Sequence, residues 1–157
     1  MEAIQLCEEF REELEQYAMS LEIYQSNLKK KKKLSKPEKP TPNIRFLGRN
    51  IFEHILLVLK RIRSPELENT LRFLNQKQCF ALLFYLEHYL RNSIDIELAS
   101  RATMYIMKTH QVQLKLSQEM LPILKSVSLH MNHHFKGLRD EIGINISALK
   151  IVQKELN

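Results

Sequence analysis

The sequence predicts an all-α fold, an array of about six helices in which the first and last helices are long and heptad-patterned. Three observations predict this class. Apolar residues make up 44% of the 157 positions, which is enough to build a core. Only 3 residues are glycine, whereas a β-rich fold needs many turn residues. Apolar side chains recur at spacings of three and four along most of the chain, and this is the period of a helix face.

Charge divides the chain into an acidic arm, a basic linker and a mildly basic body. Residues 1–28 have a net charge of −6, residues 29–39 have +6, and the remainder has +6 again. An acidic arm repels nucleic acid, so any nucleic-acid binding is expected to be local. The predicted regions are an N-terminal helix at 1–28, a proline-rich linker at 29–43 and a helical body at 44–157.

The first helix is predicted from a heptad-like apolar seam. The seam comprises Ala3, Cys7, Phe10, Leu14, Tyr17, Leu21, Tyr24 and Leu28. A stripe of this kind is typical of a helix that lies along another helix. The pattern does not decide whether that other helix belongs to the same domain or to another polypeptide. The candidate protein-binding residues here are Cys7, Phe10, Leu14, Tyr17 and Leu21.

The linker contains a lysine run followed by three prolines, which predicts an extended, solvated segment. One interpretation is a contact with RNA phosphates or a nuclear-import signal, because clustered lysines release counterions from phosphates. The other interpretation is a solvated linker, which is the commoner role of such runs. The candidate nucleic-acid-binding residues are Lys29, Lys30, Lys31, Lys32 and Lys33.

The body opens with a helix that is apolar on most sides, at residues 51–62. Ser64 is predicted to cap the next helix, with Pro65 at its first position. Eight consecutive apolar residues at 79–86 fit either a buried strand or a buried helix. No turn signals flank this run, and its polar neighbours continue a helical stretch. We therefore predict a buried helix there.

Two further helices complete the array. Ser93 is predicted to cap a helix that runs to about His110, and Ser117 is predicted to cap the last one. If unbroken, the last helix spans roughly 60 Å, which overhangs a domain whose radius of gyration is about 15 Å. Gly143 costs about 1 kcal/mol in a helix interior, which predicts a kink or break there. The candidate protein-binding residues on this helix are Met131, Phe135 and Leu138.

No constellation in the sequence predicts catalysis, a cofactor or a metal site. The phosphate-cradling patterns GxGxxG and GxxxxGK[ST] do not occur. His130, His133 and His134 share a helix face but lack the further ligand and neighbouring acid of a helical zinc site, so a solvent-facing cluster is favoured. Two cysteines are too few for a disulfide framework, which favours an intracellular protein. Neither a membrane span nor a signal peptide is expected.

Four ordered motifs resemble the C-terminal helical domain of the Utp-twelve family, also called the Dip-two family. The motifs are MEAIQL at residues 1–6, IRSPELE at 62–68, IDIELASR at 94–101 with KTH at 108–110, and LRDEIGINISAL at 138–149. The resemblance covers essentially the whole chain. The sequence departs from the family in its unusually basic linker. It also departs at Leu74-Asn75-Gln76-Lys77, where the family has a Leu-Pro-Phe-like step, and this leaves the local helix boundary open.

The resemblance implies a non-catalytic scaffold domain of a WD-repeat ribosome-biogenesis factor, belonging to a longer protein whose propellers precede it. Family members belong to the UtpB subcomplex of the small-subunit processome, where such domains associate with those of sister subunits. A nuclear, nucleolar location and contacts with pre-ribosomal RNA or the U-three small nucleolar ribonucleoprotein are implied as well. The alternative function, RNA binding through Lys29–Lys33, predicts an affinity that falls steeply with salt.

Overall fold

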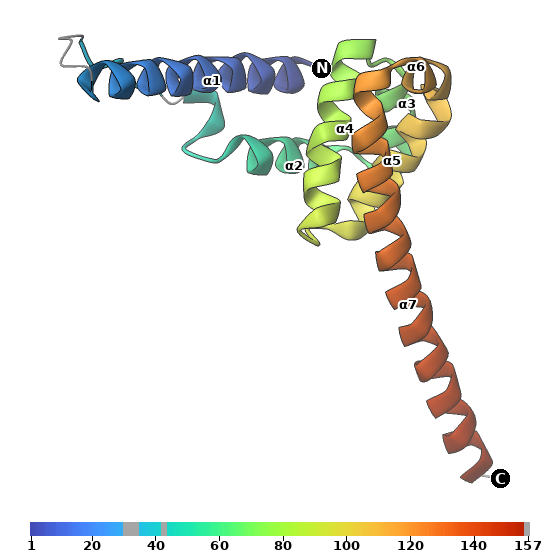
Figure 1. The fold of residues 1–157 in the computed structure, drawn as a ribbon. Coiled ribbons are helices and arrows are strands. Elements are labelled where there is room, and N and C mark those ends of the chain that lie inside the picture. Colours follow the sequence, from blue (N-terminus) through green and yellow to red (C-terminus); the bar gives the residue numbers. More distant parts are fainter. Residues whose placement is uncertain (30–34, 42–43, 156–157) are drawn as a thin grey trace. The chain divides into compact units, whose positions relative to one another are not determined.

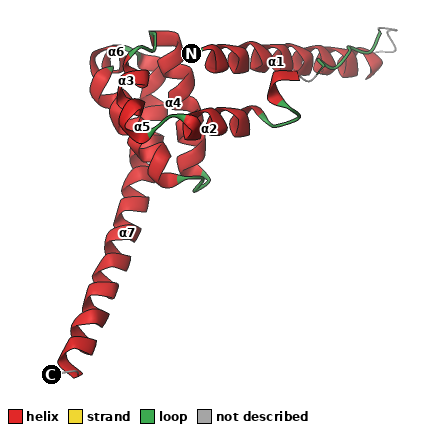
Figure 2. Cartoon of the chain, turned by 180° about the vertical axis from the view of Figure 1, so that it is seen from behind, coloured by secondary structure: helices red, strands yellow, loops and turns green. Residues whose placement is uncertain are grey.

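The computed structural model describes residues 1–29, 35–41 and 44–155, and every regular element among them is helical (Figure 2). The all-α prediction is therefore confirmed. The chain divides into two compact units, Met1–Leu67 and Glu68–Asn157. Seven α-helices occur in the described residues, joined in places by short 3-10 helices.

The first unit is built on α1 (Glu2–Lys29), which packs against α2 (Ile51–Arg61). An aromatic side chain, Phe46, bridges the two helices and is 2% exposed. Its ring lies 5.3 Å from Phe10 of α1 and 5.1 Å from His54 of α2, both edge-on. The sequence grouped this segment with the later helices, whereas the aromatic contacts tie it to the first helix.

The second unit is organised around α4 (Gln76–Arg91), which packs against α5 (Ile96–Thr109) and α7 (Leu121–Glu155) (Figure 1). The apolar run at 79–86 lies within α4, so the prediction of a buried helix is correct. The buried apolar residues of α4 are Cys79, Leu82, Leu83, Tyr85, Leu86, Tyr89 and Leu90. At 100° per residue these positions span about 160° of the helix circumference, a wide face that both α5 and α7 cover.

The helix starts predicted at Ser64, Ser93 and Ser117 differ in the structure, and the boundary that the sequence left open at 74–77 is now defined. A 3-10 turn, Gln118–Met120, separates Ser117 from the start of α7. Asn75 caps α4 in a capping box, in which its side chain accepts from the Gln78 amide at 2.8 Å. Asp95 caps α5 in place of Ser93, because its carboxylate accepts from the Leu98 amide. Ser64 is the first residue of a 3-10 turn, Ser64–Glu66, that leads into α3 (Leu67–Arg72) and has its cap one residue earlier.

A short helix that the sequence did not predict, α6 (Gln111–Leu116), follows α5. The two are separated at His110, which is 7% exposed. Nε2 of its ring lies 3.3 Å from the carbonyl oxygen of Leu71, and Nδ1 lies 3.2 Å from Oε1 of Gln113. The turn is thus held by a histidine that contacts Leu71 of α3. No local sequence motif predicts such a contact.

The last helix, α7, continues through Gly143, so the predicted break there is wrong. Ser147 Oγ donates to the Gly143 carbonyl oxygen at 2.8 Å, one turn back along the helix. A cost of about 1 kcal/mol at one glycine is smaller than the cost of ending a helix and renucleating it. Figure 1 shows the second half of α7 extending beyond α4 and α5 as a single helix.

Candidate protein-interaction surface

The second half of α7 carries an apolar stripe that is exposed. The stripe continues the face that packs in the core of the unit earlier along the helix, where Met131 is 9% exposed. Beyond that point, the exposed fraction of the stripe's side chains lies between 43% for Phe135 and 66% for Leu149. We call this stripe the α7 seam; it comprises Phe135, Leu138, Ile142, Ile146, Leu149 and Val152.

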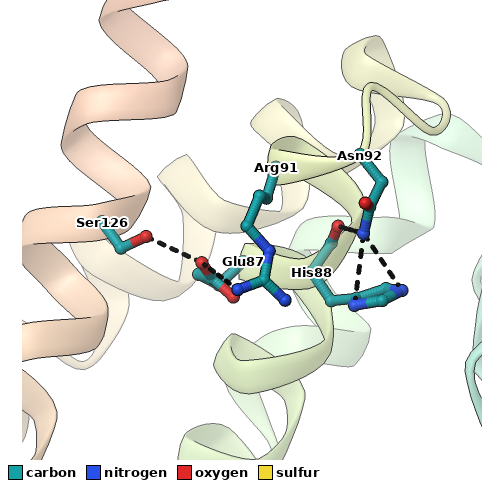
Figure 3. Close-up of polar contacts among 5 residues, drawn as sticks. All are labelled: Glu87, His88, Arg91, Asn92 and Ser126. Carbon is teal, nitrogen blue, oxygen red and sulfur yellow. Dashed lines mark hydrogen bonds and ion pairs between the residues drawn. The ribbon is translucent and has the colours of Figure 1, made fainter.

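The seam becomes exposed where α7 passes the end of α4. Ser126 Oγ donates to the carboxylate of Glu87 at 2.7 Å, and that carboxylate lies 3.9 Å from the guanidinium of Arg91 (Figure 3). Further along, Nε2 of His134 donates to the carbonyl oxygen of Leu90 at 2.7 Å. Because α4 ends at Arg91, α7 has no α4 residues to pack against beyond this contact. All residues from 135 to 154 are accordingly exposed.

A groove opens between the first half of α5 and α7, beside the start of the α7 seam. Its volume is about 1030 Å³, and its apolar walls include Ile96 and Met104 of α5 and Phe135 and Leu138 of α7. Ser100 also lines it and is 5% exposed, with a buried Oγ that has no hydrogen-bond partner among the described residues. A smaller hollow of about 500 Å³ adjoins the groove at Met104 and Phe135. The seam therefore begins in a depression with two walls.

The predicted binding residues of α1 lie partly inside the first unit. Cys7 is fully buried, and Phe10 is half-buried beside Phe46. The binding roles of Cys7 and Phe10 stay predictions. Leu14, Tyr17 and Leu21 are half-buried, and their binding role stays a prediction.

The predicted binding residues of α7 have two different environments. Met131 is in the core of the second unit, whereas Phe135 and Leu138 are exposed at the start of the seam. The rest of the seam was not among the binding residues predicted from the sequence. The sequence nevertheless contains the pattern that predicts them, because apolar residues continue at spacings of three and four to the end of the helix. The seam residues that were not predicted are Ile142, Ile146, Leu149 and Val152.

Of the lysine run, the structure describes only Lys29, which is exposed at the end of α1. Lys30, Lys31, Lys32 and Lys33 lie outside the described residues. Contact of this run with RNA therefore stays a prediction from the sequence.

The histidines and cysteines singled out in the sequence lie in different environments. Among the described residues, no three His, Cys, Asp or Glu side chains are placed to hold a metal ion. The rings of His133 and His134 lie 5.7 Å apart, with His134 bonded to α4. Burial raises the pKa of Cys7 to about 12, helped by the charge of Glu8, and burial raises that of Cys79 to about 11. Thiols of this kind are weak nucleophiles at neutral pH.

None of the helices in the described part of the chain combines the length and the apolar character that crossing a membrane requires.

Comparison with known proteins identifies relatives of this chain. It is 29% identical over 157 residues to the WD repeat-containing protein 3 homolog of Dictyostelium discoideum, covering 99% of this chain and 16% of that protein. It is 24% identical over 102 residues to WD repeat-containing protein 3 of Mus musculus and of Homo sapiens, covering 65% of this chain and 11% of each protein. The chain thus spans a small part of the length of these relatives.

A family model described as the Dip2/Utp12 family matches residues 52–154. This segment contains nearly all of α2 and α7 and the whole of α3 to α6, including the groove and the whole α7 seam. The matched segment covers well over half of the chain, and the chain therefore belongs to the Dip2/Utp12 family.

Proposed function

We propose that this chain is a non-catalytic assembly domain of a WD-repeat ribosome-biogenesis factor. In this proposal it binds the C-terminal helical domains of sister subunits of the UtpB subcomplex and so supports small-subunit ribosomal RNA processing in the nucleolus. Membership of the Dip2/Utp12 family supports the assignment, as do relatives that carry the name WD repeat-containing protein 3.

The observation that carries the binding role is the exposed α7 seam. Six large apolar side chains follow one another along a single helix face, each at least 43% exposed. Burying one such side chain fully contributes about 1.5–3 kcal/mol, so leaving all six in water is costly. Contiguous exposed apolar surface of this kind marks protein-interaction sites.

The test is size-exclusion chromatography with light scattering, on the chain alone and mixed with the C-terminal helical domain of a sister UtpB subunit. We expect a mixed complex that persists at high salt, because apolar burial is not screened by ions. The double variant Ile142→Asp with Leu149→Asp is expected to abolish the complex. The matched control is Ile144→Asp, which places the same charge on the opposite face of α7 at another exposed isoleucine.

The first helix is tested in the same assay. Replacing Leu14 and Leu21 with Asp asks whether the half-buried seam of α1 also binds the sister domain. A complex that survives this change excludes the α1 seam and leaves α7 as the interface. A chain that ignores the sister domain altogether but binds RNA at low salt contradicts the proposed function, and the lysine run then becomes its basis.

A further inference from the structure

Basic side chains line one edge of the exposed half of α7. At 100° per residue, the directions of four of them fall within about 60° of one another, next to the α7 seam. These four, the α7 basic edge, are Lys136, Arg139, Lys150 and Lys154. The opposite edge of the seam carries Glu141, whereas Asp140 lies 3.6 Å from Arg139 on the same side as the basic edge. The seam is therefore charged asymmetrically.

We propose that the α7 seam is covered by an amphipathic helix of another protein that carries a row of carboxylates along one edge of its own apolar stripe. This inference rests on the proposed function and specifies the chemistry of the partner. The seam is apolar, straight and one helix face wide, and this shape suits a helix packed along it. The carboxylate row lies against the α7 basic edge.

The groove beside the α7 seam forms one end of the proposed binding surface. Ile96, Ser100 and Met104 of α5 form a second wall that faces α7 at Leu138. A helix lying on the seam enters the groove at the base of α7 and there contacts two helices. The hydroxyl of Ser100 lies in this wall without a hydrogen-bond partner among the described residues.

A second copy of this chain is a poorer occupant of the seam. In an antiparallel pair of α7 helices, equivalent edges face each other, so the basic edge would lie against its own copy. In a parallel pair the basic edge of one copy would face the opposite edge of the other. Among the described side chains, the acidic residue on that opposite edge is Glu141. Arg139 already has Asp140 beside it, but Lys136, Lys150 and Lys154 are poorly matched in either self-pairing, and a foreign acidic helix satisfies them better.

Asn145 can fix the alignment of a helix that packs along the α7 seam. It occupies a position of the three-and-four spacing between Ile142 and Leu149, where the other members are apolar. A polar side chain in such a seam stabilises the one alignment in which it meets a polar partner, at a cost in overall stability. The partner helix is therefore expected to carry a polar residue opposite Asn145.

Two designed helical peptides test the charge rule. Both carry the same leucine stripe over three heptads, with glutamate along one edge in the first peptide and lysine in the second. Fluorescence anisotropy measures the binding of each to the full chain. We expect the glutamate peptide to bind about tenfold more tightly at low salt, because several exposed ion pairs act together. This preference shrinks at high salt, where the Debye length falls to about 3 Å.

Variants of the full chain locate the binding. The triple variant Lys136→Glu, Arg139→Glu and Lys150→Glu is expected to reverse the preference, so that the lysine peptide binds more tightly. Ile142→Asp is expected to abolish binding of both peptides, whereas Ile144→Asp on the opposite face leaves both affinities unchanged. Because all five positions are exposed, circular dichroism and the melting temperature are expected to match the unmodified chain.

The outcomes separate this inference from the proposed function. Equal binding of the two peptides overturns the charge rule, even if the sister domain still forms a complex through the seam. A dimer of the chain alone that Ile142→Asp dissolves assigns the seam to a second copy and overturns the inference. Preference for the glutamate peptide without binding of any sister domain supports the inference and contradicts the proposed function.

Discussion

Nε2 of His134 donates a hydrogen bond to the carbonyl oxygen of Leu90 at a distance of 2.7 Å. Leu90 lies in the last turn of α4, where carbonyl groups lack regular helical partners. The Leu90 carbonyl oxygen also accepts from the Ser93 amide at 3.3 Å, so His134 adds a second donor, from another helix, at the end of α4. It also marks the point along α7 after which every side chain up to residue 154 is exposed.

Replacing His134 with alanine is expected to destabilise the second unit by about 1 kcal/mol, since a partly buried carbonyl loses its side-chain donor. Urea denaturation measures the change. His133→Ala is the matched control, because that neighbour is exposed and is expected to change stability by less than about 0.5 kcal/mol. Equal effects of the two substitutions would show that the His134 contact does not stabilise the fold.

Binding and folding are expected to separate along α7. Ile142→Asp should remove sister-domain binding while the melting temperature stays the same, because the side chain is 50% exposed. Leu86→Ala should cost about 2–5 kcal/mol, since Leu86 is fully buried in α4. Thermal unfolding and chromatography on the same samples measure both properties. A large loss of stability in Ile142→Asp would contradict the exposure of the seam.

The cap of α5 is testable with one substitution at Asp95 and one at Ser93. Asp95→Ala is expected to cost about 0.5–2 kcal/mol, because the Leu98 amide loses its acceptor. Ser93→Gly is expected to be neutral or stabilising, since Ser93 has a φ of 57° and glycine adopts that region without steric cost. Chemical denaturation of both variants decides between the two candidate caps. A larger loss in Ser93→Gly than in Asp95→Ala would restore the prediction made from the sequence.

The free energy of unfolding is expected to fall as the pH rises above 9.0, the ordinary pKa of a cysteine thiol. Burial holds the folded pKa of Cys7 at about 12 and that of Cys79 at about 11, so the unfolded chain loses these protons first. The folded state then binds more protons, and the free energy of unfolding decreases with pH. The variant Cys7→Ala with Cys79→Ala should show a shallower decrease in melting temperature over this range. An unchanged slope would mean that the thiols ionise equally in both states.

Replacing Lys29 to Lys33 with alanine is expected to leave binding of the sister domain unchanged within about twofold, because rim and linker charges contribute little to an apolar interface. A fluorescence-anisotropy titration measures the affinity for the sister domain. If the lysines contact RNA, the same variant loses RNA affinity and the dependence of that affinity on salt becomes flatter. A loss of sister-domain binding would instead place the linker in the interface.

The sequence predicted best where local pattern and tertiary packing agree. The buried helix at 79–86 and the two heptad-patterned helices were predicted correctly, because the spacing of apolar residues indicates which face of a helix is buried. The same spacing contained the whole α7 seam. It did not reveal which part of the stripe is buried, because Met131 and Leu138 occupy equivalent positions and differ only in whether other helices of the unit cover them.

The sequence by itself determined the all-helical class, the long first and last helices and the absence of motifs for phosphate-binding loops. The tertiary structure decided the rest. Phe46 joins Phe10 and His54 across helices, and His134 reaches Leu90 from far along the chain. Contacts between residues so distant in sequence leave no periodic trace, because each depends on the one place where two helices meet. The end of α4, and not any feature of α7, therefore decides where the apolar face becomes a binding surface.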